Sequence, residues 1–245
     1  MIKTRWKSKE EIRSLLGGAR RVAVLSCGVC ANLCGTGGQA GLDSFSELLA
    51  GWGVETAAKA CINACCSEEI MRDAVRTYIE PVRPLIDAVA LVACAGGVKS
   101  AFLLLPGLAV LAPLDTVGVS TITASTDPVA TSTCKGCGSC VLTLTQGICP
   151  VSACPKKKLY GPCREYPQEG RACALEPERD CAWKIILERG GNLEELKALA
   201  VMHKEGPAPY NTAKAAGKPP AWFRGLAARI MARSGRLAWI FHSIR

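Results

Sequence analysis

Histidine is almost absent from this chain of 245 residues: only His203 and His242 occur. Histidine is the side chain most often used for proton transfer in catalysis, and neither residue lies near a plausible nucleophile. We therefore expect a chain that is not itself a catalyst. A corrinoid-binding protein with a D-x-H-x-x-G motif is disfavoured, because residues 1–202 contain no histidine. Any metal site must be built almost wholly from thiolates.

The sequence also lacks an apolar run long enough to cross a membrane. Its most apolar stretch, residues 88–114, is interrupted by Lys99, Gly96-Gly97 and Pro106-Gly107. No uncharged part of it reaches the roughly 18 residues that a spanning helix needs. No apolar segment follows the charged opening MIKTRWKSKEEIR, so we expect no secretory signal. A soluble, cytoplasmic protein is predicted.

Acidic residues are missing after Glu205, whereas seven lysines and arginines follow it and supply +7 of the net charge of +9. The rest of the chain is nearly neutral, which argues against binding to nucleic acid. Residues 201–245 are predicted to form an extended basic tail. Trp222, Phe223 and Leu226 approximate one face of a terminal amphipathic segment. Such a segment could dock on a partner protein, on its own domain or on a membrane surface.

Strand-like and helix-like segments alternate over residues 1–125. Apolar runs predict strands at 21–27, 54–61, 87–94 and 108–114, and amphipathic or capped segments predict helices at 7–18, 43–53, 67–79 and 98–105. Alternation at this spacing indicates a parallel sheet with crossover helices. We therefore expect an α/β fold with a Rossmann-like or flavodoxin-like domain. A polar linker at 123–133 and a Cys-rich domain over 126–200, with helices at 177–191 and 192–204, should follow it.

Cysteine, in contrast, is abundant, with fifteen residues. Thiols in the cytosol stay reduced, so a dense pattern there favours metal binding over disulfides. Cys27, Cys30 and Cys34 follow the first strand as C-x2-C-x3-C, and further cysteines follow two later strands: Cys61, Cys65, Cys66 and Cys94. Ligands bind outside the carboxyl ends of strands in such sheets, so these cysteines should converge.

This first set is predicted to hold a [4Fe–4S] cluster through Cys27, Cys30 and Cys34, with Cys94 or Cys66 as the fourth ligand. Our working assignment is Cys94. Zinc, or buried thiols without metal, are the alternatives. The glycines of GTGGQAG also come near the dinucleotide-binding fingerprint, although their spacing differs by one residue.

A second set opens with Cys134, Cys137 and Cys140 in the C-x2-C-x2-C spacing that begins a bacterial ferredoxin motif. The spacing leaves the fourth ligand open, and our working assignment is Cys149. Four more cysteines, Cys154, Cys163, Cys173 and Cys181, complete eight within 48 residues. They are assigned to a third cluster or to zinc, because paired cysteines of this kind also occur in zinc ribbons.

The stretch CKGCGSCVLTLTQGICPVSACPKKKLYGPC, followed by CALEPERDCAWKIILERG, resembles the Cys-rich domain of the small, MetV-type subunit of methylenetetrahydrofolate reductases from acetogens and related anaerobes. All eight cysteines from Cys134 to Cys181 fall on the family's cysteines. Family proteins also have a strand, a C-x2-C-x3-C loop and later single cysteines like Cys66 and Cys94. Two departures are the YGPCR segment, where the family has Asn-Gly-Pro-Cys-Gly, and the basic tail.

The resemblance implies an iron–sulfur subunit of a methylenetetrahydrofolate reductase, with two or three [4Fe–4S] clusters and zinc as the alternative at one site. Its partner would be a flavin-containing catalytic barrel subunit. Electrons would come from ferredoxin or a heterodisulfide-reductase-like complex. The alternative hypotheses for the function of this chain are a zinc-stabilised scaffold without redox chemistry and a corrinoid or methyl-transfer partner.

Overall fold

A four-stranded parallel sheet forms the centre of the computed structural model, which describes residues 2–119 and 134–205. Its strands are β2 (Arg21–Cys27), β3 (Glu55–Ile62), β4 (Ala88–Val92) and β5 (Ala109–Leu111), in the order β3-β2-β4-β5. The side chains of β4 are all buried, as expected for a strand covered on both faces. The predicted α/β class is confirmed. The chain runs to opposite sides of β2 in this flavodoxin-like order, so the topological switch lies between β2 and β4.

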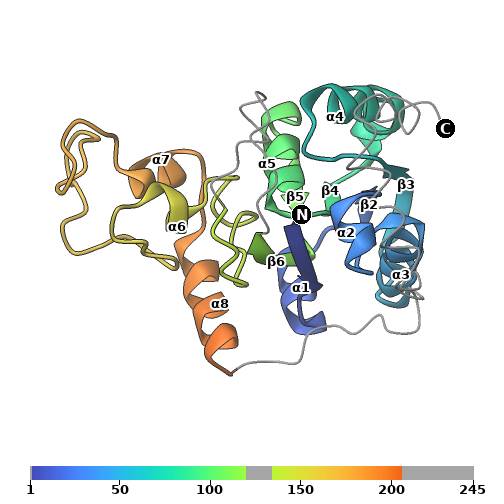
Figure 1. Ribbon diagram of the computed structural model, residues 1–245, viewed down its shortest axis with the longest axis horizontal. Coiled ribbons are helices and arrows are strands. Elements are labelled where there is room, and N and C mark those ends of the chain that lie inside the picture. The colour runs from blue at the N-terminus through green and yellow to red at the C-terminus, as the bar shows by residue number, and fades with distance from the viewer. Residues whose placement is uncertain (1, 120–133, 206–245) are drawn as a thin grey trace, which may run out of the picture.

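Helices cover this sheet (Figure 1). They are α1 (Lys9–Leu16), α2 (Cys30–Leu33), α3 (Gly38–Gly51), α4 (Glu68–Ala74) and α5 (Ala95–Leu104), and two further turns, η1 (Val75–Ile79, a π-helix) and η2 (Glu80–Leu85, a 3₁₀ helix), follow α4. The helix predicted at 43–53 begins earlier, at Gly38, so its expected first residues, Asp43 and Ser44, do not cap it. Both residues lie inside the helix, where Ser44 donates to the Ala40 carbonyl and Asp43 accepts from Gln39.

A short antiparallel ribbon was not predicted. It joins β1 (Ile2–Trp6) to β6 (Leu114–Val119) beside the main sheet. Thr4 and Trp6 are buried, whereas Lys3 and Arg5, which precede each of them, are exposed. This alternation is the period of a half-buried strand, but the charged residues obscured it. The ribbon places the first residues of the chain next to the segment that leads into the cysteine-rich region.

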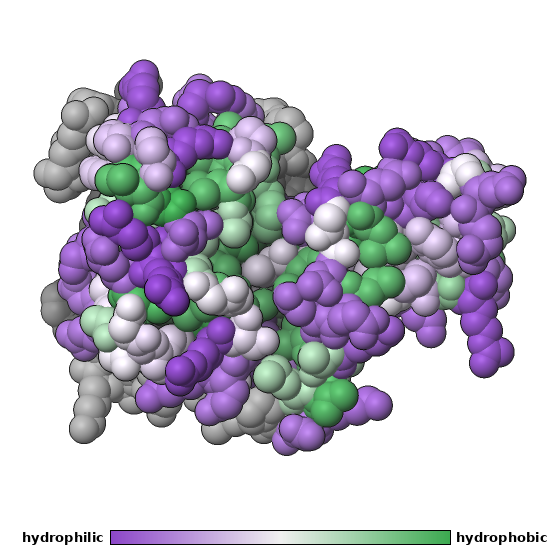
Figure 2. Space-filling model, turned by 180° about the vertical axis from the view of Figure 1, so that it is seen from behind, coloured by the Kyte–Doolittle hydropathy of each residue, from purple (hydrophilic) through white to green (hydrophobic). Residues whose placement is uncertain are grey.

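Residues 134–205 form a smaller lobe at one end of the molecule, seen from opposite sides in Figures 1 and 2. It consists mainly of turns, with α6 (Pro150–Ala153), α7 (Ala182–Glu188) and α8 (Leu193–Glu205). Trp183, Ile186 and Leu196 are centred in its own apolar core, against which Leu15 of α1 also packs. The predicted helix at 177–191 begins only at Ala182, because Ala172 and Asp180 first pair as an antiparallel bridge.

The predicted linker at 123–133 and the basic tail after residue 205 lie outside the described residues. Within residues 2–119 and 134–205, no helix is both long and apolar enough to cross a membrane.

Candidate metal centres

The first cysteine group lies at the carboxyl edge of the sheet and comprises seven residues: Cys27, Cys30, Cys34, Cys61, Cys65, Cys66 and Cys94. Cys27 ends β2, Cys65 and Cys66 follow β3, and Cys94 precedes α5 after β4. Cys27 and Cys94 therefore flank the topological switch. The strand order thus brings together thiols that are up to 67 positions apart, since 94 minus 27 is 67.

The thiols in the centre of this group are buried and influence one another. A hydrogen bond from Cys65 lowers the pKa of Cys27 to about 6. Burial raises the pKa of Cys94 to about 12, and a charge on Cys27 adds to this effect. The pKa of Cys65 is also raised, first by its bond to Cys27 and then by burial. Several thiolates can coexist here only if a cation offsets their repulsion and their desolvation, as a metal does.

The other members are less centrally placed. Burial raises the pKa of Cys30, and charges on Cys27 and Cys34 raise it further. The Cys34 sulfur lies 3.5 Å from the Ile2 carbonyl oxygen of β1. Cys61 is exposed. Cys65 was not assigned as a ligand from the sequence, yet its thiol is fully buried and hydrogen-bonded to Cys27. The structure therefore offers Cys65 and Cys66 beside Cys27 and Cys94 as ligands.

Gly97 in the first turn of α5 allows the close approach of the Cys65 loop. A Cβ atom at this position would lie 2.6 Å from the Cys65 Cβ and 2.8 Å from the Ala93 Cβ, and neither atom can move without its backbone. We expect Gly97→Ala to destabilise the fold by about 1–3 kcal/mol through overpacking. Urea unfolding would measure the loss.

The matched control is Gly51→Ala at the end of α3, where an added Cβ meets nothing within 4 Å. That variant should gain about 0.5–1 kcal/mol, because alanine is the better helix former. Equal stability of the two variants would refute the close approach at Gly97.

The glycines of the GTGGQAG loop are explained by packing within the loop. A Cβ on Gly37 would lie 2.6 Å from the Ala31 Cβ and 2.8 Å from the Cys27 carbonyl oxygen. Gly38 has a φ of 67°, in the region that favours glycine. The loop between β2 and α3 therefore needs these glycines to close, whether or not it binds a nucleotide.

The second cysteine group comprises Cys134, Cys137, Cys140 and Cys149, which the structure brings together. Burial raises the pKa of Cys134, and charges on Cys149 and Cys137 raise it further. Burial also raises the pKa of Cys140 to about 12, with Cys134 among the contributing charges. Hydrogen-bond donors point at two of these sulfurs. The Gly136 amide lies 3.4 Å from the Cys134 Sγ, and the Ser152 hydroxyl lies 3.6 Å from the Cys149 Sγ.

The third cysteine group comprises Cys154, Cys163, Cys173 and Cys181, and all four line one small pocket with Trp183. Two backbone bonds bring the last two into register: the Cys173 amide donates to the Arg179 carbonyl at 2.9 Å, and the Cys181 amide donates to the Arg171 carbonyl at 2.6 Å. Lys156 and Glu165 form an ion pair of 2.6 Å at the same pocket. Four thiols in one pocket are a donor set suited to a cluster or to zinc.

All fifteen cysteines are free thiols. Among the residues that the structure describes, no three or more His, Cys, Asp or Glu side chains are already arranged around a single metal ion. The four thiolates of a [4Fe–4S] cluster each bind a different iron, so they surround a larger object than one ion. Which cysteines share a metal remains a prediction.

The fold and these groups define an α/β protein with three sets of neighbouring thiols and a cysteine-rich second lobe. Residues 115–207 match a family model described as the C-terminal region of methylene-tetrahydrofolate reductase. The matched segment contains the second and third cysteine groups. It relates this part of the chain to methylenetetrahydrofolate reductase and so to one-carbon metabolism. No curated protein and no solved structure matches the chain.

Proposed function

We propose that this chain is the iron–sulfur electron-transfer subunit of a methylenetetrahydrofolate reductase complex. It would relay low-potential electrons to the flavin of a separate catalytic barrel subunit. The observation that carries the proposal is the second cysteine group, four neighbouring thiols inside the segment that matches the reductase family. Bound iron–sulfur clusters would supply one-electron transfer.

The residues of the second group fit such a cluster. Cys134, Cys140 and Cys149 pack against the main apolar core, which keeps water from one side of the site. The Gly136 amide and the Ser152 hydroxyl can donate to the sulfurs. Hydrogen bonds to sulfur and exclusion of solvent are two means by which a protein adjusts the potential of a cluster.

The first and third groups extend this proposal to two or three sites. The first would hold a [4Fe–4S] cluster at the sheet edge through Cys27 and Cys94, with further ligands from Cys30, Cys34, Cys65 or Cys66. The third would hold another cluster or zinc. We assign no catalytic residue to this chain, so the reduction itself would belong to the flavin subunit. Ferredoxin or a heterodisulfide-reductase-like complex would be the electron donor.

Purification of the full chain without oxygen tests the proposal. We expect about eight or more irons per chain with matching acid-labile sulfide, because each [4Fe–4S] cluster holds four irons. Dithionite reduction should produce an EPR signal from reduced clusters. Stoichiometric zinc at one site only would assign zinc to that site. Zinc with little iron or sulfide would contradict the proposal and favour a scaffold without redox chemistry.

A further inference from the structure

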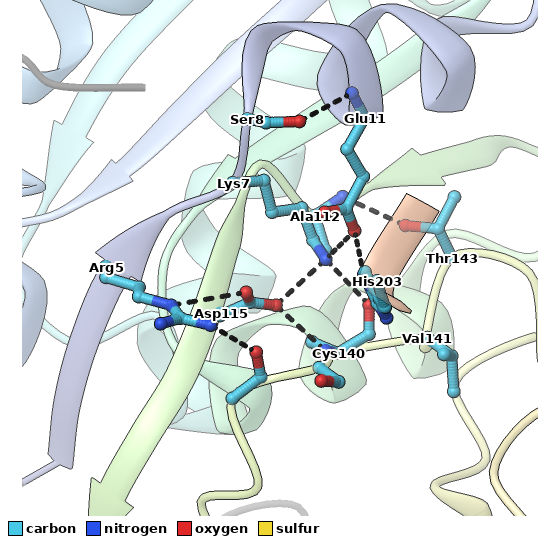
Figure 3. A network of polar contacts seen from close by, with 12 residues as sticks. Arg5, Lys7, Ser8, Glu11, Ala112, Asp115, Cys140, Val141, Thr143 and His203 are labelled. Atoms are coloured by element: carbon cyan, nitrogen blue, oxygen red, sulfur yellow. Dashed lines mark hydrogen bonds and ion pairs between the residues drawn. The ribbon is translucent and has the colours of Figure 1, made fainter. Parts of the chain in front are cut away.

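A buried ionic network contacts the backbone of Cys140, a member of the second cysteine group (Figure 3). Lys7, in the turn between β1 and α1, is only 1% exposed. Its ammonium donates to the Asp115 carboxylate at 2.9 Å, to the Cys140 carbonyl at 2.8 Å and to the Glu11 carboxylate. A buried lysine with three such partners is a fixed positive charge next to a predicted cluster ligand.

Asp115 of β6 binds the backbone amide of Cys140, whose carbonyl is bound by Lys7. Its Oδ1 accepts from the Cys140 amide at 2.8 Å. Arg5 of β1 lies 3.6 Å from its Oδ2 and donates to the Gly138 carbonyl at 2.9 Å. Both polar backbone groups of Cys140 are therefore bound by buried charged side chains, the carbonyl by Lys7 and the amide by Asp115. The β1–β6 ribbon thus fixes the loop that carries Cys137 and Cys140.

The network continues away from Cys140 into the small lobe. The Glu11 carboxylate accepts a hydrogen bond from Nε2 of His203 in α8, with 3.2 Å between the two atoms. Nδ1 of the same ring lies 2.6 Å from the Tyr160 hydroxyl. Tyr160 lies between Cys154 and Cys163 of the third group. Removing one buried charge from this network leaves its partners without compensation. Each charged member therefore contributes strongly to the electrostatic potential around Cys140.

We propose that Lys7 and Asp115 are positioning residues that set the reduction potential of the iron–sulfur group held by the second cysteine group. The inference rests on the proposed function, since it requires that group to bind a cluster. Reduction adds one negative charge to a cluster. The Lys7 ammonium stabilises that charge and raises the potential, whereas the Asp115 carboxylate opposes it and lowers the potential. Low polarity around buried groups strengthens both effects.

Two variants with opposite charge changes test this inference in the full chain purified without oxygen. Lys7→Met removes the cation. Asp115→Asn removes the anion but keeps its shape and an oxygen that can accept from the Cys140 amide. Redox titration followed by EPR should show a lower midpoint for Lys7→Met and a higher one for Asp115→Asn. We expect a change on the order of tenfold in the equilibrium constant of reduction, which for one electron is about 59 mV.

The control is Lys59→Met, which removes the same charge from an exposed pair with Asp43. It should leave every midpoint unchanged, and the signal of the first group should not move in any variant. If both variants keep their full iron content and their midpoint potentials are unchanged, or shift in the same direction, this inference is wrong while the proposed function stands.

If Lys7→Met fails to fold, the midpoint potential of Asp115→Asn alone tests the inference: a higher midpoint supports it, and an unchanged or lower midpoint overturns it. Loss of the second group's iron from both variants would show a purely structural role and overturn the inference. A wild-type chain without iron and sulfide would overturn the proposed function as well, which distinguishes that failure from the others.

Discussion

Cys134→Ser will remove about four irons and four sulfides per chain if the second group holds the [4Fe–4S] cluster proposed for it, because the loss of one thiolate prevents assembly of that cluster. Cys134 is the member whose charge interacts with all three of the others, Cys137, Cys140 and Cys149. Iron and sulfide analysis after purification without oxygen measures the loss. One reduced-cluster EPR signal should disappear with it.

The control for this loss is Cys61→Ser. Cys61 is exposed and belongs to none of the assigned ligand sets, although it lies at the same sheet edge as Cys27. This variant should retain all of the iron, and the comparison separates a specific ligand from a general sensitivity to thiol removal. If Cys134→Ser kept its full complement of iron, the assignment of the second group to a cluster would be wrong.

The centre of the sheet was predictable from the sequence because its two central strands, β2 and β4, are buried on both faces. The run from Arg21 to Cys27 forms β2 as expected, and the run around Ala88 to Val92 forms β4. The crossover pattern then placed both at one edge with their cysteines. Strand order along the sheet was not predictable, since the pattern gives alternation and does not say which strands become neighbours.

The ligand details were less predictable, because spacing along the chain does not say which side chains point inward. Cys34 completes the C-x2-C-x3-C motif but its sulfur lies against the Ile2 carbonyl of β1, a strand that was not predicted. Cys65 belongs to no sequence motif, and its thiol is nevertheless hydrogen-bonded to Cys27. Its signal was its position in the loop after β3, where convergence was expected.

The buried charges could not be inferred at all from local sequence. Lys7 and Glu11 lie in the segment 7–18 that was predicted to be an amphipathic helix, and Asp115 lies more than 100 positions away. The antiparallel ribbon joins them, since it pairs β1 with β6 and so brings Asp115 beside Lys7. A lysine in a charged opening segment carries no sign that it will be buried.

Lys7→Met will lower the free energy of unfolding by about 3–5 kcal/mol, because removing one partner of a buried ion pair leaves the other charge uncompensated. Here two carboxylates, Glu11 and Asp115, would lose their shared cation. The midpoint of urea unfolding, measured by proteolysis without oxygen, gives the change. Lys59→Met, at an exposed ion pair, should cost no more than about 1 kcal/mol.

The pH dependence of that difference follows from the shifts in the wild-type chain. Burial opposes the ammonium of Lys7, but Asp115 and Glu11 outweigh it and raise its pKa. Lys7 therefore contributes its stability at every pH below the ordinary lysine range, and loses it only as pH rises through the raised pKa. Burial opposes the Glu11 carboxylate too, yet bonds from His203 and Lys7 lower its pKa. Its contribution is present above the ordinary carboxyl range and is lost as pH falls through the lowered pKa.

In Lys7→Met the pH effect of Glu11 reverses its direction, because a buried carboxylate that has lost its lysine binds a proton more tightly than it does in the unfolded chain. The folded variant then gains stability on acidification through Glu11, whereas Glu11 of the wild type, with its lowered pKa, gives no such gain. The deficit of the variant should therefore narrow between about pH 8 and about pH 5. A deficit that stays constant over this range would mean that Glu11 finds another cation or water when Lys7 is absent, and the network would not depend on its lysine.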